Sequence, residues 1–310
     1  MIIQTENLTK KFKSTEAVSL LNLTVEEGSI YGFLGPNGAG KTTTIRLLLG
    51  LIAPSAGEVL LFGQRLQRDK RQVLRNIGSL VETPSLYPHL TGKENLQVVT
   101  TLLDLPQERI GQVLQLVDLA QDAHRKVSEY SLGMKQRLGI ALALVHQPRL
   151  LILDEPTNGL DPQGIREMRE FLRTLPEKLS ITVFLSSHLL SEVEQIATHI
   201  GIINRGKLIF QNTLSALQDQ TRNLIAFQVS NPQKARALLQ QHIVPNQNAT
   251  QDDHTVLIRV NSENEVSEVT KRLVWEDIDI YAVIPQTLHL EDLFFHYTGK
   301  ELPTLPPERS

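Results

Sequence analysis

The segment GPNGAGKTT, residues 35–43, has the residue types and spacing of a phosphate-binding loop. It contains a glycine, four residues and then Gly-Lys-Thr, and it stands between an apolar run and an amphipathic one. The glycines let successive amides point at phosphate oxygens, and a following helix adds the positive end of its dipole. A glycine-rich turn without a ligand is the alternative. The residues that we expect to bind nucleotide are Gly35, Pro36, Asn37, Gly38, Ala39, Gly40, Lys41, Thr42 and Thr43.

An acidic pair follows the apolar run LLIL of residues 150–153. Because the carboxyl ends of parallel strands meet at one edge of a sheet, Asp154 would lie beside the loop and hold Mg²⁺ with the Thr42 hydroxyl. Glu155 would then polarise the attacking water as general base. Lys41 would neutralise the terminal phosphates. An ordinary pair of acids at a strand end is the alternative reading of this pair.

A histidine ends the next apolar segment, in SSHLLSE, residues 186–192. His188 would lie at the same sheet edge, where a donor could hold the γ-phosphate and the attacking water. A histidine taken alone is more often a surface or capping residue. Its position directly after a predicted core strand favours the catalytic reading.

The elements that must position these residues alternate as strands and helices, which is typical of an α/β domain. Several apolar runs are rich in branched residues on both faces, as in the central strands of a covered sheet. Thr91 and Glu94 form a capping box that predicts a helix start. We expect strands at 29–35, 57–63, 77–81, 149–154 and 181–187, helices at 42–51, 91–103 and 106–117, and a hairpin at 199–210.

Composition predicts two domains and excludes several classes of protein. A chain of 310 residues suits two domains, and a change to polar composition near residue 219 marks the boundary. We expect a nucleotide-binding domain at 1–219, a small α/β domain at 220–300 with a helix from residue 287, and a mobile proline-rich tail at 301–310. A net charge of -3 gives no footprint for nucleic acid. The sequence shows no signal peptide and no apolar run long enough to span a membrane.

These motifs, with SLGMKQR at 131–137 and NGLDP at 158–162, occur in an order that resembles the nucleotide-binding subunit of ABC transporters. The resemblance covers residues 1 to about 215 and implies an ABC-type phosphate-loop NTPase fold. It further implies that Ser131 and Gly133 bind the γ-phosphate held by a second copy, so that the active unit is a homodimer around two ATP. Asp161 matches the loop that links the two sites. Phe12 matches an aromatic position that stacks on adenine, although a core phenylalanine is an equal alternative.

The sequence departs from the common pattern of this family at three positions. Leu132 and Met134 stand where the signature usually has glycine and glutamine, so a glutamine side-chain contact would be lost. Glu82 stands where most members have a glutamine that contacts Mg²⁺ and the attacking water. An acid there keeps an oxygen ligand and adds a negative charge near the γ-phosphate. A solvated loop carboxylate is the alternative.

With Glu82, the segments YSLGMKQR and LEDLFFHYTG resemble the bacitracin-resistance and lantibiotic-immunity branch of the family. We therefore expect an ATPase on the cytoplasmic face of the cell membrane that docks on an integral-membrane permease through the loop at 82–90. Export of another cargo, such as a lipid, polysaccharide, haem or small drug, is the alternative. A non-transport ATPase acting on DNA or ribosomes is disfavoured, since the chain has one cassette and no extended heptad run. The small domain would support the dimer or regulate it.

Overall fold

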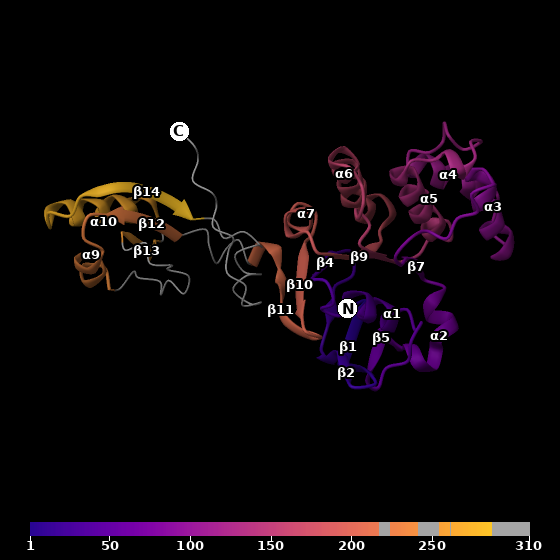
Figure 1. Ribbon diagram of the computed structural model, residues 1–310, viewed down its shortest axis with the longest axis horizontal. Helices are drawn as coiled ribbons and strands as arrows, with labels where there is room; N and C mark the ends of the chain where they lie inside the picture. The colour runs from indigo at the N-terminus through magenta and orange to yellow at the C-terminus, as the bar shows by residue number, and fades with distance from the viewer. Residues whose placement is uncertain (217–223, 241–253, 261, 287–310) are drawn as a thin grey trace. The chain divides into compact units, whose positions relative to one another are not determined.

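The computed structural model describes residues 1–216, 224–240, 254–260 and 262–286 (Figure 1). The chain divides into two compact units, Met1–Thr213 and a second that begins at Leu214. The first unit carries the predicted phosphate loop. The domain boundary expected near residue 219, the helix expected from residue 287 and the tail at 301–310 lie outside the described residues.

A six-stranded, mostly parallel sheet forms the centre of the first unit (Figure 1). Its order is β11-β10-β4-β9-β8-β7, and only β11 runs antiparallel to its neighbour. All residues of the strands β4, β9 and β8 are buried, as their mainly apolar sequences predict. The expected strands and the hairpin are confirmed as β4 (Ile30–Leu34), β7 (Ile77–Leu80), β8 (Leu150–Asp154), β9 (Thr182–Ser187), β10 (His199–Asn204) and β11 (Lys207–Thr213).

A second, antiparallel sheet has the order β2-β1-β5-β6, with β3 paired to β1. Of its strands, the sequence predicted the one at 57–63, which is present as β5 (Ala56–Leu61). The others are β1 (Ile3–Phe12), β2 (Thr15–Leu21), β3 (Thr24–Val25) and β6 (Gln64–Arg65). One hydrophobic core joins this sheet, the central sheet and α1 (Lys41–Leu48). Its aromatic centre is the stacked pair Tyr31 and Phe184, with ring centroids 5.5 Å apart.

Helices surround the two sheets, and α3, α4 and α5 pack together as a group (Figure 1). The capping box of α3 is confirmed, since the Thr91 amide donates to Glu94 Oε2 at 2.8 Å and the Glu94 amide donates to Thr91 Oγ1 at 3.2 Å. Helix α1 ends three residues before the prediction, because Gly50 adopts φ +60°. The remaining helices are α2 (Leu66–Leu74), α3 (Gly92–Leu102), α4 (Glu108–Leu116), α5 (Leu132–Leu144), α6 (Pro162–Leu179) and α7 (Leu190–Glu194).

The second unit contains a three-stranded antiparallel sheet with the order β13-β12-β14. Its core includes Phe227, Ile258 and Leu273, all fully buried. The expected alternation of strands and helices is present as β12 (Leu224–Val229), α9 (Pro232–Leu238), β13 (Thr255–Arg259), α10 (Glu263–Trp275) and β14 (Ile280–Gln286). In neither unit do the described residues form a helix with the length and apolarity that crossing a membrane requires.

Candidate active site

Three adjacent parallel strands bring the predicted site residues to one edge of the central sheet. In the register of the sheet, Leu34 of β4 lies opposite Ser187 of β9, and Ser186 lies opposite Asp154 of β8. The residues that follow these strand ends therefore emerge side by side. They are Gly35, which begins the phosphate loop, and the predicted catalytic residues His188 and Glu155.

The phosphate loop turns through glycines into the N-terminus of α1. Gly38 and Gly40 have φ of +78° and +110°, values that favour glycine, and a Cβ on Gly40 would lie 2.5 Å from the Ala17 carbonyl oxygen. In the described structure no side chain caps α1, so its first amides remain available to an anion. The loop surrounds a hollow of about 180 Å³, lined by Ala17, Asn37, Gly38, Gly40, Lys41, Thr42, Thr43 and Glu155.

The Lys41 ammonium is held inside this loop. The residue is 6% exposed, and Nζ donates to the Gly35 carbonyl at 2.8 Å and to the Pro36 carbonyl at 3.4 Å. Nζ also lies 3.2 Å from Glu155 Oε1. A buried cation needs such partners, and these place its charge between the loop and the predicted general base.

The Glu155 carboxylate joins the lysine to His188. Its second oxygen, Oε2, lies 2.5 Å from His188 Nδ1. When Nδ1 carries the proton that is donated to Glu155, a neutral imidazole presents Nε2 as an acceptor. His188 therefore donates to a phosphate through Nε2 only when both ring nitrogens are protonated, which refines the donor role expected from the sequence.

Asp154 is 4% exposed and is held by a residue that the sequence analysis did not single out. The hydroxyl of Ser186 donates to Asp154 Oδ1 at 2.6 Å. The same hydroxyl oxygen accepts the Glu155 amide at 3.0 Å. The only signal for this contact in the sequence was the Ser186–Ser187 doublet before His188.

The signature residues and Asp161 lie at helix N-termini within the chain. Ser131 caps α5, where its Oγ accepts the Met134 amide at 3.2 Å, and Gly133 lies in the first turn. Asp161 caps α6, where its Oδ1 accepts the Gly164 amide at 3.0 Å. The Asp-Pro pair at the start of α6 is a sequence signal for this cap. The described contacts of Ser131 and Asp161 are thus helix caps, and their expected roles across a dimer stay predictions.

Phe12 is not a core residue, which removes that alternative. It ends β1, is 46% exposed, and has the Lys10 ammonium 5.0 Å from its ring centroid. An exposed aromatic ring is compatible with stacking on a base.

Glu82 forms an ion pair with Arg46 of α1, a partner that the sequence analysis did not foresee. Both side chains are exposed, at 61% for Glu82 and 42% for Arg46, and Glu82 has φ +60°. Glu82 is thus an exposed loop carboxylate, as its alternative reading expects, but one paired with an arginine, and its expected contact with Mg²⁺ stays a prediction.

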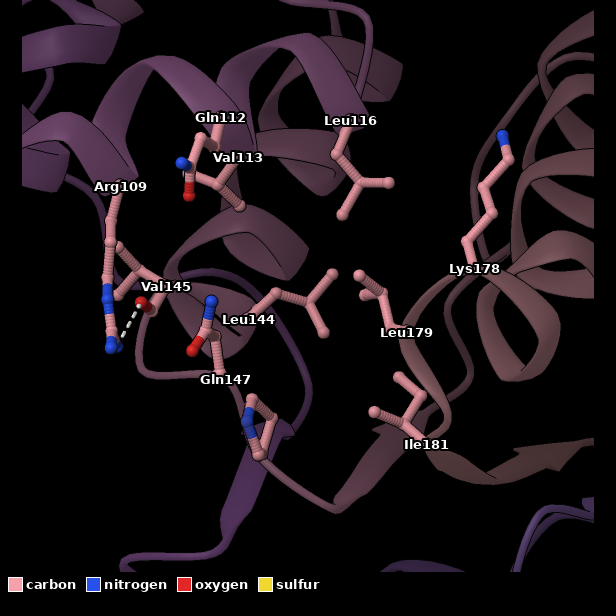
Figure 2. A pocket seen from close by; sticks show the side chains of 11 residues that line it. Arg109, Gln112, Val113, Leu116, Leu144, Val145, Gln147, Lys178, Leu179 and Ile181 are labelled. Atoms are coloured by element: carbon pink, nitrogen blue, oxygen red, sulfur yellow. Dashed lines mark hydrogen bonds between the residues drawn. The ribbon is translucent and has the colours of Figure 1, made fainter.

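A larger hollow, of about 420 Å³, lies between α4 and the C-terminal ends of α5 and α6 (Figure 2). Its two cationic side chains lie at helix ends: Arg109 Nη1 donates to the Val145 carbonyl at 3.4 Å, and Lys178 lies in the last turn of α6. Leu144 and Leu179 project into it between these cations (Figure 2). Its described lining contains no carboxylate and no acid–base pair, so the smaller hollow at the loop is the candidate active site.

Known proteins match this chain over the part that contains the phosphate loop, and in some cases over nearly its whole length. The model of a family described as ABC transporter matches residues 18–158. The bacitracin transport ATP-binding protein BcrA of Bacillus licheniformis is 45% identical over 300 residues, which are 96% of this chain and 97% of that protein. The lantibiotic transport ATP-binding protein SrtF of Streptococcus pyogenes is 40% identical over 230 residues, which are 73% of this chain and 99% of that protein.

Solved structures share the fold. An ATP-binding subunit of an ABC transporter superposes with a TM-score of 0.63 at 28% identity, over 71% of this chain and 93% of that one. An ATP-binding cassette, solved as a dimer in a post-hydrolysis state with ADP and phosphate, superposes with a TM-score of 0.61 at 25% identity. The match covers 68% of this chain and 98% of that one.

Proposed function

Because this chain belongs to the ABC transporter family, as an ATP-binding and ATP-hydrolysing subunit, we propose that two copies close around two Mg-ATP and drive a separate membrane permease. The observation that carries this proposal is the cluster of Lys41, Glu155 and His188 beside the phosphate loop. It joins an anion-binding site to a candidate general base. The proposed site of action is the cytoplasmic face of the membrane, reached through the permease.

The site residues fit a magnesium ion held together with phosphate. Asp154 is a buried carboxylate with one oxygen bound by Ser186, and Thr42 contributes a hydroxyl in the first turn of α1. Mg²⁺ prefers oxygen ligands and is bound in such sites by one or two protein groups together with phosphate oxygens and water. When bound, the ion would neutralise charge on the phosphates. In our proposal Thr42 and Asp154 hold it, and Glu82 approaches it when released from Arg46.

The chain's own residues would then divide the work. The loop amides and Lys41 bind the phosphates. Bound phosphate would therefore compete with Glu155 for the Lys41 ammonium. Glu155 polarises the attacking water, and His188 positions Glu155 through its Nδ1 contact. Ser131 and Gly133, at the N-terminus of α5, would bind the γ-phosphate of the second copy, and Asp161 would link the two sites. The relative solved as a dimer with ADP and phosphate supports this arrangement.

We assign ATP binding to residues 1–219 and an accessory role, in dimer support or regulation, to residues 220–300. For the permease, we propose docking on the loop at 82–90. Tyr87 in this loop is 50% exposed, while its backbone is held by the buried Asn95, whose Oδ1 accepts the Tyr87 amide at 2.8 Å. Pro84 packs against α5 at Gly139. A fixed backbone with an exposed ring suits a protein contact.

We propose that the cargo is a peptide antibiotic of the bacitracin or lantibiotic type, on the strength of the two relatives named above. Cells lacking the gene should become sensitive to bacitracin or to a lantibiotic. The wild-type gene should restore growth, and Glu155→Gln should not, because removal of the cargo needs hydrolysis. The measurement is the inhibitory concentration of each antibiotic. No change across the panel would reject this cargo and favour another exported substrate.

Glu82→Gln should leave ATP affinity unchanged and change the rate of hydrolysis several-fold, because it removes a negative charge near the phosphates and the pair with Arg46. Stability should change by less than about 1 kcal/mol, since both partners are exposed. Steady-state ATPase assays and ATP titrations check this. Glu58→Gln is the matched control, because Glu58 pairs with Arg65 at 2.9 Å in the antiparallel sheet. A Glu82 variant as active as this control would remove Glu82 from the site.

A further inference from the structure

Ser186 connects the two acids of the site. It is the second-to-last residue of β9 and is fully buried, at 0% exposure. Its hydroxyl lies 2.6 Å from Asp154 Oδ1 and 3.0 Å from the Glu155 amide nitrogen, and its carbonyl oxygen accepts the same amide at 3.2 Å. One side chain thus contacts both a proposed metal ligand and the backbone of the proposed base.

The direction of these hydrogen bonds is fixed by chemistry. An amide nitrogen can only donate, so the Ser186 oxygen accepts from Glu155. The single hydroxyl proton is therefore free to go to Asp154, where the short distance is typical of a bond to an ionised carboxylate. Bonds of this kind are about twice as strong as neutral ones. Because Asp154 is buried, Ser186 determines which of its oxygens stays available to a metal ion.

The same contact supports an unusual backbone conformation. Glu155 has φ +49°, in the left-handed region that a residue with a Cβ seldom adopts. Such a conformation persists only when the surroundings hold it. The two oxygens of Ser186 hold the Glu155 amide, and thereby orient the side chain toward Lys41 and His188.

We propose that Ser186 is a positioning residue for ATP hydrolysis, which orients Asp154 toward Mg²⁺ and Glu155 toward the attacking water. The proposal rests on the proposed function of the site. It assigns a role to a residue that touches neither nucleotide nor metal, and that acts through its two acidic neighbours.

The test compares the dissociation constants of a non-hydrolysable ATP analogue, AMP-PNP, in Mg²⁺ and in EDTA, by calorimetry on the full chain. The ratio of the two constants is the magnesium gain. Ser186→Ala should keep the affinity measured in EDTA within about twofold, because the loop and Lys41 are intact. The magnesium gain should fall about tenfold, the effect of losing one hydrogen bond to a charged group. The rate of ATP hydrolysis should fall by at least the same factor.

Ser187→Ala is the matched control. Ser187 is also buried, at 4% exposure, and its hydroxyl accepts the Leu189 amide at 3.0 Å. The Ser187→Ala substitution also removes a hydroxyl from β9, and this variant should retain the full magnesium gain. If Ser186→Ala does not fold, as judged by its thermal midpoint, Ser186→Cys keeps nearly the same volume with a weaker donor and carries the same expectation.

A folded Ser186 variant with the wild-type magnesium gain would overturn the proposal. An equal loss of affinity in EDTA and in Mg²⁺ would do so too, because it would indicate general damage to the loop. If the wild-type protein does not bind AMP-PNP, the proposed function itself fails, which is a separate result from the behaviour of the variants.

Discussion

Glu155→Gln should slow ATP hydrolysis by about 10²-fold or more while ATP affinity stays near the wild-type value. The substitution keeps the size of the side chain and removes the negative charge that makes the carboxylate a base. Phosphate binding depends instead on the amides at the start of α1 and on Lys41, which loses its ion pair with Glu155 but keeps its contacts with the Gly35 and Pro36 carbonyls. Single-turnover hydrolysis and equilibrium ATP binding, measured on the same preparation, check the two halves of the prediction.

A second glutamate–histidine pair, away from the site, gives this test a matched control. Glu26 also faces a histidine, with its Oε2 3.5 Å from His199 Nε2. Strand β10 begins at His199, whereas the site lies where β8 and β9 end, so this second pair lies at the opposite edge of the sheet. Glu26→Gln should therefore leave hydrolysis unchanged. Wild-type turnover in the Glu155 variant would assign the base to another residue, and a loss in both variants would indicate damage to the fold.

The strands that carry the site were predictable because their signals are local. Each is a short apolar run, and a buried parallel strand needs apolar residues on both faces. The rule that chemistry gathers at the carboxyl ends of such strands then placed Gly35, Asp154, Glu155 and His188 at one edge. The structure confirms this placement, because β4, β9 and β8 are neighbours in register.

The contacts that tune the site were not predictable, because they join distant residues. Ser186 contacts Asp154, 32 residues away in the sequence, and Arg46 contacts Glu82, 36 residues away. Which strands become neighbours, and in which register, depends on packing of the whole unit. Local sequence patterns do not show which strands pair or in which register. The antiparallel sheet of β1, β2, β5 and β6 was largely missed for the same reason. The cap formed by Asp161, in contrast, had a local signal in the following proline.

Lys41→Ala should lower ATP affinity by about 10²-fold or more, because a charge-assisted contact to phosphate is lost and each such bond contributes about 1.5–3 kcal/mol. The lysine is the one cation among the described residues that line the hollow at the phosphate loop. Its Nζ is held 2.8 Å from the Gly35 carbonyl, so the ammonium stays over the loop. Titration with ATP in the presence of Mg²⁺ measures the loss.

Because Lys41 is buried, the loss of affinity must be separated from loss of folding. Lys70→Ala is the matched control: its ammonium donates to the Gly50 carbonyl at 2.6 Å, just beyond the other end of α1. Each variant removes a lysine ammonium that donates to a backbone carbonyl next to α1, but only Lys41 faces the phosphate loop. The Lys70 variant should bind ATP as the wild type does. Unchanged affinity in a folded Lys41 variant would contradict the assignment of residues 35–43 to phosphate binding, on which every other role in the site depends.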